Sequence, residues 1–305
     1  MKISKKGYAL QKRGNRDTKR ALLLLSPMLL LLGSIVVYPI IYSIYLSLQY
    51  YVLTDKANRR FIGLENYLAV FQDATFWTAL GNTAVWVSIT LAVQFLVGMI
   101  LAYLLNKPFR GRGIVRSVVL LPWVTPGVVI ALMWRLIYDG GNMGVLNDLL
   151  KKTSLISQNV PWLAQPETAL YAQIVSMIWQ GIPFFTIMIL AAMQGIPGDL
   201  YEAAAVDGCS PLKKYWYVTW PHILPTVIIT VFLRIVWIAN NTELIYTMTQ
   251  GGPGTSSLTV SVYTYMQAQK SMNFGYASAL SIVMTLMLSV FMILYINLLD
   301  KKDGI

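Results

Sequence analysis

The chain is poor in the residues that build disulfide frameworks, metal centres and soluble surfaces. Its 305 residues include one cysteine, Cys209, which excludes an internal disulfide, and one histidine, His222, which argues against a zinc cluster. Charged residues make up 12% of the chain, about half the share in soluble domains. No G-x-x-x-x-G-K-[ST] phosphate-binding loop occurs. We therefore expect no metal, no cofactor bound by this chain and no enzymatic activity of its own.

Hydrophobic residues are abundant instead, at 56% of the chain. Six stretches reach the length of about 20 residues that a helix needs to cross a bilayer. They are Ala21–Leu48, Thr78–Leu105, Ile114–Tyr138, Thr168–Met193, His222–Met248 and Phe274–Leu299. The first, at 28 residues, is too long for the apolar core of a cleaved signal peptide. The sequence predicts an all-α polytopic membrane protein with six transmembrane helices.

The distribution of Lys and Arg predicts the orientation. The net charge is +11, which in a membrane protein indicates cytoplasmic loops rather than a nucleic-acid partner. With both termini in the cytoplasm, 16 of the 24 Lys and Arg residues fall on the cytoplasmic side and six on the other. We expect residues 1–20 to form a basic cytoplasmic segment and residues 21–305 a transmembrane domain, in a bacterial-type cell membrane.

A polar segment with strong helix signals interrupts the apolar runs at 195–221. Asp199 is expected to cap a helix, with Glu202 completing a capping box. Gly208 is placed to end that helix in the left-handed conformation, and Ser210 to cap a second one. These signals predict a helix, a glycine turn and a second helix in a cytoplasmic loop.

Two interpretations of this loop are open. In the first it is a compact connection in which Glu202 only caps its helix. In the second the small side chains of Ala203, Ala204 and Ala205 let another backbone approach, and the Glu202 carboxylate docks onto a soluble partner. The fork of an Arg side chain would bind that carboxylate through two hydrogen bonds.

The spacing in this loop favours the second interpretation. It reads Glu202-Ala203-Ala204, three residues, Gly208, nine residues, then Val-Thr-Trp-Pro ending at Pro221. This resembles the EAA loop of the permease subunits of binding-protein-dependent ABC importers, in which the last part is Ile-x-Leu-Pro. The two replacements, by Val and Trp, are both apolar and leave the helix start intact. Phe61–Thr83, Gly251–Pro253 and the Tyr38-Pro39 pair are similar to carbohydrate-type permeases, and to the maltose-type first subunit among them.

The resemblance implies the type I importer permease fold and alternating access driven by partner subunits. Those partners would be a second homologous permease, two ATPase subunits that hold ATP and Mg²⁺, and an extracytoplasmic binding protein that delivers a carbohydrate. The loop would form a coupling helix seated in the ATPase. Its contact residues would be Glu202, Ala203, Ala204, Asp207 and Gly208, although Asp207 could instead cap the turn.

Polar residues within the spans predict the substrate pathway, because such groups are costly in lipid and face cavities. The candidates are Trp237, Asn240, Asn241, Glu243, Trp179 and Gln180. Amides and a carboxylate beside aromatic rings suit a sugar, and the resemblance places the two asparagines in a sugar site.

Several of these residues have a second interpretation. The asparagine pair could bond neighbouring helices only, and Glu243 could pair with Arg135. Arg234, near the middle of its span, could line a closed gate.

Two other functions remain open at the level of sequence. A permease of the same architecture could carry glycerol-phosphate or another small polar solute, but a phosphate site would need more cavity cations than Arg234 alone. An ion-coupled secondary transporter would need charged relays and an inverted repeat, and few charges and no repeat are evident.

Overall fold

The computed structural model describes residues 21–141 and 143–303, with side chains up to residue 297. The first long helix spans Ala21–Ser47, and α2 (Tyr38–Ser47) is its second half. The next helices are α3 (Glu65–Gln72), α4 (Ala74–Asn106), α5 (Arg112–Val124), α6 (Gly127–Ile137), α7 (Val145–Lys152) and α8 (Pro166–Gln194). They continue with α9 (Gly198–Val206), α10 (Pro211–Lys214), α11 (Trp220–Ala239), α12 (Glu243–Thr249), α13 (Val260–Gln269) and α14 (Phe274–Asp303). The expected basic segment 1–20 lies outside the described residues.

The described residues contain five helices long and apolar enough to span a membrane, and α5 with α6 makes a sixth span if it is counted as one. The five are Ala21–Ser47, Ala74–Asn106, Pro166–Gln194, Pro211–Thr249 and Phe274–Asn297. The predicted fold class is therefore confirmed. The span predicted over 114–138 is made of two helices, since α5 and α6 meet at 94°. Pro126 forces Thr125 into an extended conformation (ψ 130°), which ends α5 at Val124.

Two spans adjust to proline by widening one turn. A π-helical turn, η1 (Gly33–Val37), lies just before Pro39, and another, η3 (Tyr215–Thr219), lies just before Pro221. Proline has no N–H to donate and its ring crowds the preceding turn, so a wider turn accommodates both effects.

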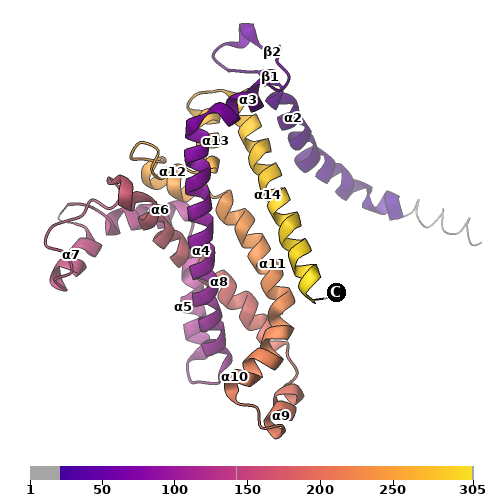
Figure 1. Ribbon diagram of the computed structural model, residues 1–305, viewed down its shortest axis with the longest axis vertical. Coiled ribbons are helices and arrows are strands. Elements are labelled where there is room, and N and C mark those ends of the chain that lie inside the picture. The colour runs from indigo at the N-terminus through magenta and orange to yellow at the C-terminus, as the bar shows by residue number, and fades with distance from the viewer. Residues whose placement is uncertain (1–20, 142, 304–305) are drawn as a thin grey trace, which may run out of the picture.

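The core of the molecule is the pair α4 and α8, with α11 packed against both (Figure 1). One stripe of α4 is buried at helical spacing, from Ala79 through Trp86 and Gln94 to Ala102. Gly98 lies in this stripe because a Cβ there would come within 2.5 Å of the Phe185 Cβ. The two longest helices of the core therefore approach closely.

The first long helix diverges from this core. None of its most apolar window is buried, and only its second half, α2, packs against α14 (Figure 1). A short hairpin of β1 (Gln49–Tyr50) and β2 (Arg60–Phe61) follows it, at the end of the molecule opposite α9. Asn66 joins the hairpin to α3 by donating to the carbonyls of Ser47 and Gln49, both at 2.8 Å.

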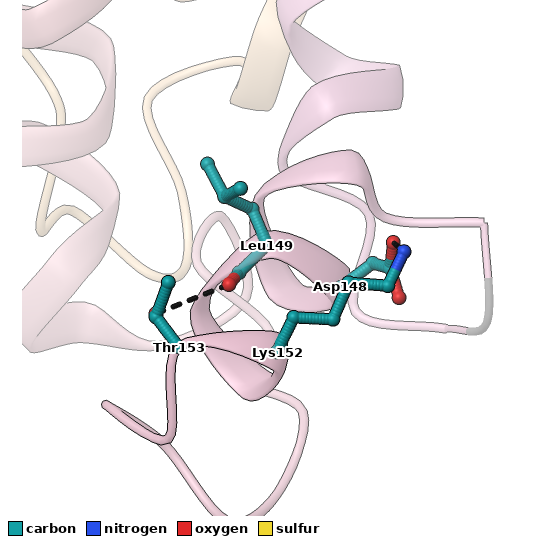
Figure 2. A network of polar contacts seen from close by, with 4 residues as sticks. All are labelled: Asp148, Leu149, Lys152 and Thr153. Carbon is teal, nitrogen blue, oxygen red and sulfur yellow. Dashed lines mark hydrogen bonds and ion pairs between the residues drawn. The ribbon is translucent and has the colours of Figure 1, made fainter.

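A small helix, α7, stands on the loop between α6 and α8. Figure 2 shows its surface ion pair, in which Lys152 Nζ lies 2.7 Å from Asp148 Oδ2, and the Thr153 hydroxyl donating to the Leu149 carbonyl. Both charged side chains are exposed, so this pair contributes little to stability. The residues of α7 therefore serve as control positions away from the proposed sites.

Candidate functional site

The loop between α8 and α11 folds as a compact knuckle, α9 and α10, at one end of the molecule (Figure 1). Gly208 adopts a left-handed φ of 72° and ends α9, as predicted. Its N–H donates to Ala205 O at 3.1 Å, and the next N–H, of Cys209, donates to Ala204 O at 2.9 Å. Ser210 caps α10 by accepting from the Lys213 amide, which confirms the second predicted cap.

The first predicted cap is wrong. Helix α9 begins at Gly198 with Pro197 as its N-cap, and no side chain caps it. The fixed φ of Pro197 (−59°) starts the helix at Gly198, two residues earlier than a capping Asp199 would. Asp199 therefore lies in the first turn, where its charge suits the positive end of the helix dipole. Glu202 has no capping role, and its carboxylate bonds no described residue.

The knuckle presents its surface outward. Glu202, Ala203, Asp207 and Gly208 are exposed, Ala204 is half-buried, and no residue of α9 is buried. One side-chain bond anchors it, between the hydroxyls of Tyr201 and Thr219 at 2.9 Å. The five predicted contact residues thus share a small protrusion that is tied directly to the start of α11.

The two spans that contain a break, α5 with α6 and α11 with α12, contact each other through α6 and α12. The break after α11 follows from asparagine chemistry, because Asn240 Nδ2 donates back to Val236 O at 2.9 Å and Asn241 Oδ1 accepts from the Leu244 amide at 3.3 Å. Asn241 thereby starts α12. The span predicted over 222–248 is therefore made of α11 and α12, with a break at 240–242.

Helices α6 and α12 lie side by side beyond the two breaks and cap one another. Glu243 Oε1 accepts from the Val128 amide at the start of α6, at 3.1 Å. Arg135 Nη1 donates to Thr247 O near the end of α12, at 3.4 Å. Gly127 makes room for the carboxylate, since a Cβ there would lie 2.3 Å from Glu243 Oε2. Glu243 and Arg135 do not form the ion pair considered above; each instead complements the end of the other's helix.

The residues predicted for the substrate pathway divide into two groups. Trp237, Asn240 and Glu243 are exposed, and Asn241 is half-buried beside them. Trp179 packs edge-on against Trp134 at 6.0 Å between ring centroids, and the buried Gln180 Oε1 has no partner.

Sequence reasoning missed an aromatic cluster beside the first group. The Trp237 ring lies 5.2 Å from that of Phe184, which in turn lies 6.1 Å from that of Trp123. Trp123 and Trp237 are each 45% exposed. The signal for Trp123 was the helix-breaking Thr-Pro-Gly that follows it, in the middle of an apolar run.

Behind this cluster lies a buried guanidinium. Arg234 is 5% exposed, and its Nε and Nη2 both donate to Gln94 Oε1, at 3.1 and 2.8 Å. Gln94 in turn donates to Met177 O at 2.6 Å, and the Phe184 ring lies 5.7 Å from the guanidinium. A Cβ at Gly181 would lie 2.1 Å from both side chains. Gln94 also escaped the sequence analysis, although it is a polar residue inside a predicted span.

At the opposite end from the knuckle, Asp73 joins three helices. It caps α4 by accepting from the Thr75 amide at 2.8 Å, and it accepts from the hydroxyls of Tyr263 and Tyr276. Burial alone would raise the pKa of Asp73, but these hydrogen bonds outweigh burial and hold it below its ordinary value of 3.8. Burial and the bond to Asp73 raise the pKa of Tyr263 to about 12, so that this donor stays protonated at neutral pH.

An all-α chain of apolar spans, with an exposed helical knuckle between the fourth and fifth of them, has the architecture of a membrane permease. The family described as the binding-protein-dependent transport system inner membrane component matches residues 94–302. The chain belongs to this family, and is thus a multi-pass inner-membrane transport component and not a catalytic enzyme. The resemblance inferred from the spacing of Glu202 and Gly208 is confirmed.

Relatives cover nearly the whole chain. It is 34% identical over 291 residues to the sulfoquinovosyl glycerol transport system permease protein SmoG of Agrobacterium fabrum, covering 94% of this chain and 92% of that protein. It is 30% identical to the trehalose/maltose transport system permease protein MalF of Thermococcus litoralis, covering 92% of this chain and 94% of that one.

A solved structure shares the fold. A chain of a bacterial ABC transporter involved in the import of the acidic polysaccharide alginate superimposes with a TM-score of 0.79 at 25% identity, covering 97% of this chain and 99% of its own. The same transporter in complex with an alginate pentasaccharide-bound periplasmic protein gives a TM-score of 0.77, again at 25% identity, over 92% of this chain and 94% of its own.

Proposed function

We propose that this chain is the membrane-spanning permease subunit of an ATP-driven importer that translocates a carbohydrate delivered by an extracytoplasmic binding protein. The observation that carries the proposal is the knuckle: an exposed, glycine-ended helical unit whose Glu202 carboxylate bonds nothing in the described chain. The sugar permeases among its relatives, and the alginate importer that shares its fold, support a carbohydrate as the cargo.

The knuckle is the contact with a separate ATPase subunit, which holds the ATP and Mg²⁺. Ala203, Ala204 and Gly208 leave room for a second backbone, and Glu202 and Asp207 supply charge. To shift the ratio of a transporter's two conformations from 1:99 to 99:1, a partner must bind one of them more tightly than the other by about 5.5 kcal/mol. Closure of two ATPase subunits around nucleotide supplies that free energy, and the Tyr201–Thr219 bond transmits the movement to α11.

This assignment places the knuckle end and both termini in the cytoplasm. The cations at the described knuckle end agree with that orientation, since Lys107, Arg110 and Arg112 join α4 to α5 there, and Lys213 and Lys214 lie in α10. A second homologous permease completes the pathway, which is supported by the first long helix: its apolar window is 0% buried by this chain.

The carbohydrate pathway follows the surface where the two broken spans meet. Trp237 offers a ring face for sugar C–H groups, and Asn240 and Asn241 offer amides for hydroxyls. We assign Trp179, Gln180 and Glu243 to the walls that support this surface, and Arg234 to the closed gate behind it.

The test is ATP-dependent uptake. The chain would be reconstituted in liposomes with the second permease, the ATPase and the binding protein encoded beside it, and a panel of neutral and acidic sugars supplied. We expect uptake of at least one sugar, strongly reduced by Asn240→Ala with Asn241→Ala. Glu202→Ala should abolish uptake while the chain still inserts, because losing one partner of a buried ion pair costs about 3–5 kcal/mol.

Asp199→Ala is the matched control, since it removes a carboxylate from the same helix outside the predicted contact. Uptake that persists without any ATPase, or that survives Glu202→Ala unchanged, would contradict the proposal.

A further inference from the structure

A groove of about 500 Å³ runs between the end of α4 and the start of α10. Its lining is apolar apart from tyrosine hydroxyls and comes from α4, from α10 and from the first residue of η3: Met99, Ile100, Tyr103, Leu104, Pro211, Leu212 and Tyr215. Its floor is closed by the Tyr215 hydroxyl against Met99 Sδ at 2.8 Å and by the edge-on contact of the Tyr103 and Tyr215 rings at 6.2 Å. The groove is therefore a formed feature of the surface.

The rim of this groove stays open. Ile100 and Leu104 are 59% and 49% exposed, and Leu212 is 68% exposed. These side chains project from a membrane span and from α10, which leads into the next span, so we expect the groove to lie where the hydrocarbon layer meets the cytoplasmic surface. Something apolar and elongated must cover it, because no other part of the described chain does.

The membrane-surface end of the groove carries positive charge. Ile100, Tyr103 and Leu104 follow one another at helical spacing on α4, and Lys107 is the residue that directly follows the helix. The Lys107 Nζ is held over the Tyr103 ring, 4.7 Å from its centroid. Lys213 follows the groove residue Leu212 directly on α10.

No carboxylate competes for these cations along the two segments that form the groove. The chain contains no Asp or Glu from residue 74 to residue 138, nor from residue 208 to residue 242. Arg110, Arg112 and Lys214 add to the positive charge of these two segments, and the acidic residue nearest to α10 along the chain is Asp207, which directly follows α9.

We propose that this groove binds an anionic phospholipid, with one acyl chain against Ile100, Leu104 and Leu212 and the headgroup phosphate between Lys107 and Lys213. Charge complementarity selects this occupant over a neutral lipid or a second copy of the chain. An acyl chain along the stripe from Ile100 to Lys107 would cover about 10 Å of helix, at about 1.5 Å per residue. The inference goes beyond the proposed function, since it needs only that these spans lie in a bilayer.

The position of this site has a consequence for coupling. Helix α10 lies between the knuckle helix α9 and the span α11, so a lipid held against Leu212 and Tyr215 contacts the segment through which movement passes. The lipid composition of the bilayer would thereby bias the knuckle's position.

Native mass spectrometry of the full-length chain in detergent tests the site. Delipidated protein would be titrated with phosphatidylglycerol and with phosphatidylcholine of the same acyl chains. We expect phosphatidylglycerol to bind more tightly, and Lys107→Gln and Lys213→Gln each to weaken it by about fivefold. Lys151→Gln with Lys152→Gln, in α7, removes two charges elsewhere and should leave the preference unchanged.

A second variant tests the apolar part independently. Leu104→Trp with Leu212→Trp fills the groove, and because both side chains are exposed the fold should persist. We expect loss of the tightly bound lipid. Equal binding of the two lipids, equal loss in the α7 control, retention after groove filling, or a chain dimer that excludes lipid would each overturn the proposal.

Discussion

Arg234 carries a positive charge into a membrane span with no carboxylate beside it. Its partner is a neutral amide, Gln94, which accepts two hydrogen bonds and passes one on to Met177 O. A charge in such a place is costly and is typical of a functional site. A Cβ at Gly181 would clash with both side chains, so α8 has no room for a larger residue against this pair.

We predict that Gln94→Leu destabilises the chain by about 3–5 kcal/mol, because it leaves the guanidinium buried without an acceptor. Adding Arg234→Met should restore much of that loss, since both buried polar groups are then gone. Denaturant unfolding of the full chain in detergent, as a double-mutant cycle, measures the coupling. Purely additive effects would contradict the assigned pair.

Asp73 is the second residue with an unusual environment. Its pKa is lowered, so the stability that its carboxylate contributes is complete above the ordinary value of 3.8 and is lost as pH falls through the lowered pKa. Asp73→Asn should therefore reduce the melting temperature at neutral pH and flatten its fall at acid pH. Asp148→Asn, in the exposed pair of α7, should change neither. An unaltered acid limb in the Asp73 variant would show that this contact is not made.

At the scale of elements, the mutual capping of α6 and α12 is the feature that joins the two broken spans. Each helix receives a charged side chain at an end that needs one, Glu243 at the start of α6 and Arg135 at the end of α12. We infer that the two helices move as one unit about the breaks at Thr125–Pro126 and 240–242.

The prediction for this unit rests on Gly127. Gly127→Ala would place a Cβ 2.3 Å from Glu243 Oε2 and expel the carboxylate. We expect a loss of about 1–2 kcal/mol, the usual cost of an N-cap, and a much smaller loss when Glu243→Ala is already present. Gly113→Ala is the control, because a Cβ at that helical glycine would meet nothing within 4 Å. Equal costs with and without Glu243 would contradict the capping.

The same elements show what the sequence could and could not predict. Hydropathy located the five helices that could span a membrane and the bent pair α5 and α6, because the ability to cross a bilayer depends on length and composition. The Gly208 turn and the Ser210 cap were predictable from local chemistry. The Asp199 cap failed because Pro197 competes for the helix start. Both span breaks follow from local chemistry, of Pro126 and of the Asn240–Asn241 pair, but the pairing of α6 with α12 depends on contacts between distant segments.

The candidate site divides in the same way. The proposed coupling residues were identified from fixed spacing along the chain. Gln94 bonds Arg234, and Trp123 lies next to Trp237 through Phe184, only because different spans pack together. No local sequence pattern predicts that packing.

At the scale of the whole molecule, one helix, α11, connects the knuckle to the place where the two spans break. The Tyr201–Thr219 bond ties α9 to the start of α11, and α11 ends at Ala239 after 20 residues, about 30 Å away. A movement imposed on the knuckle therefore reaches the proposed sugar surface through a single helix packed against α4 and α8.

The most direct measurement of this account is a photocross-link from the knuckle in the assembled transporter. A photoreactive residue placed at Ala203 should join this chain to the ATPase subunit, whereas one placed at Leu149 in α7 should not. Cross-linking of the Ala203 position to lipid alone, with the ATPase present and active, would contradict the assignment of the knuckle as the coupling site.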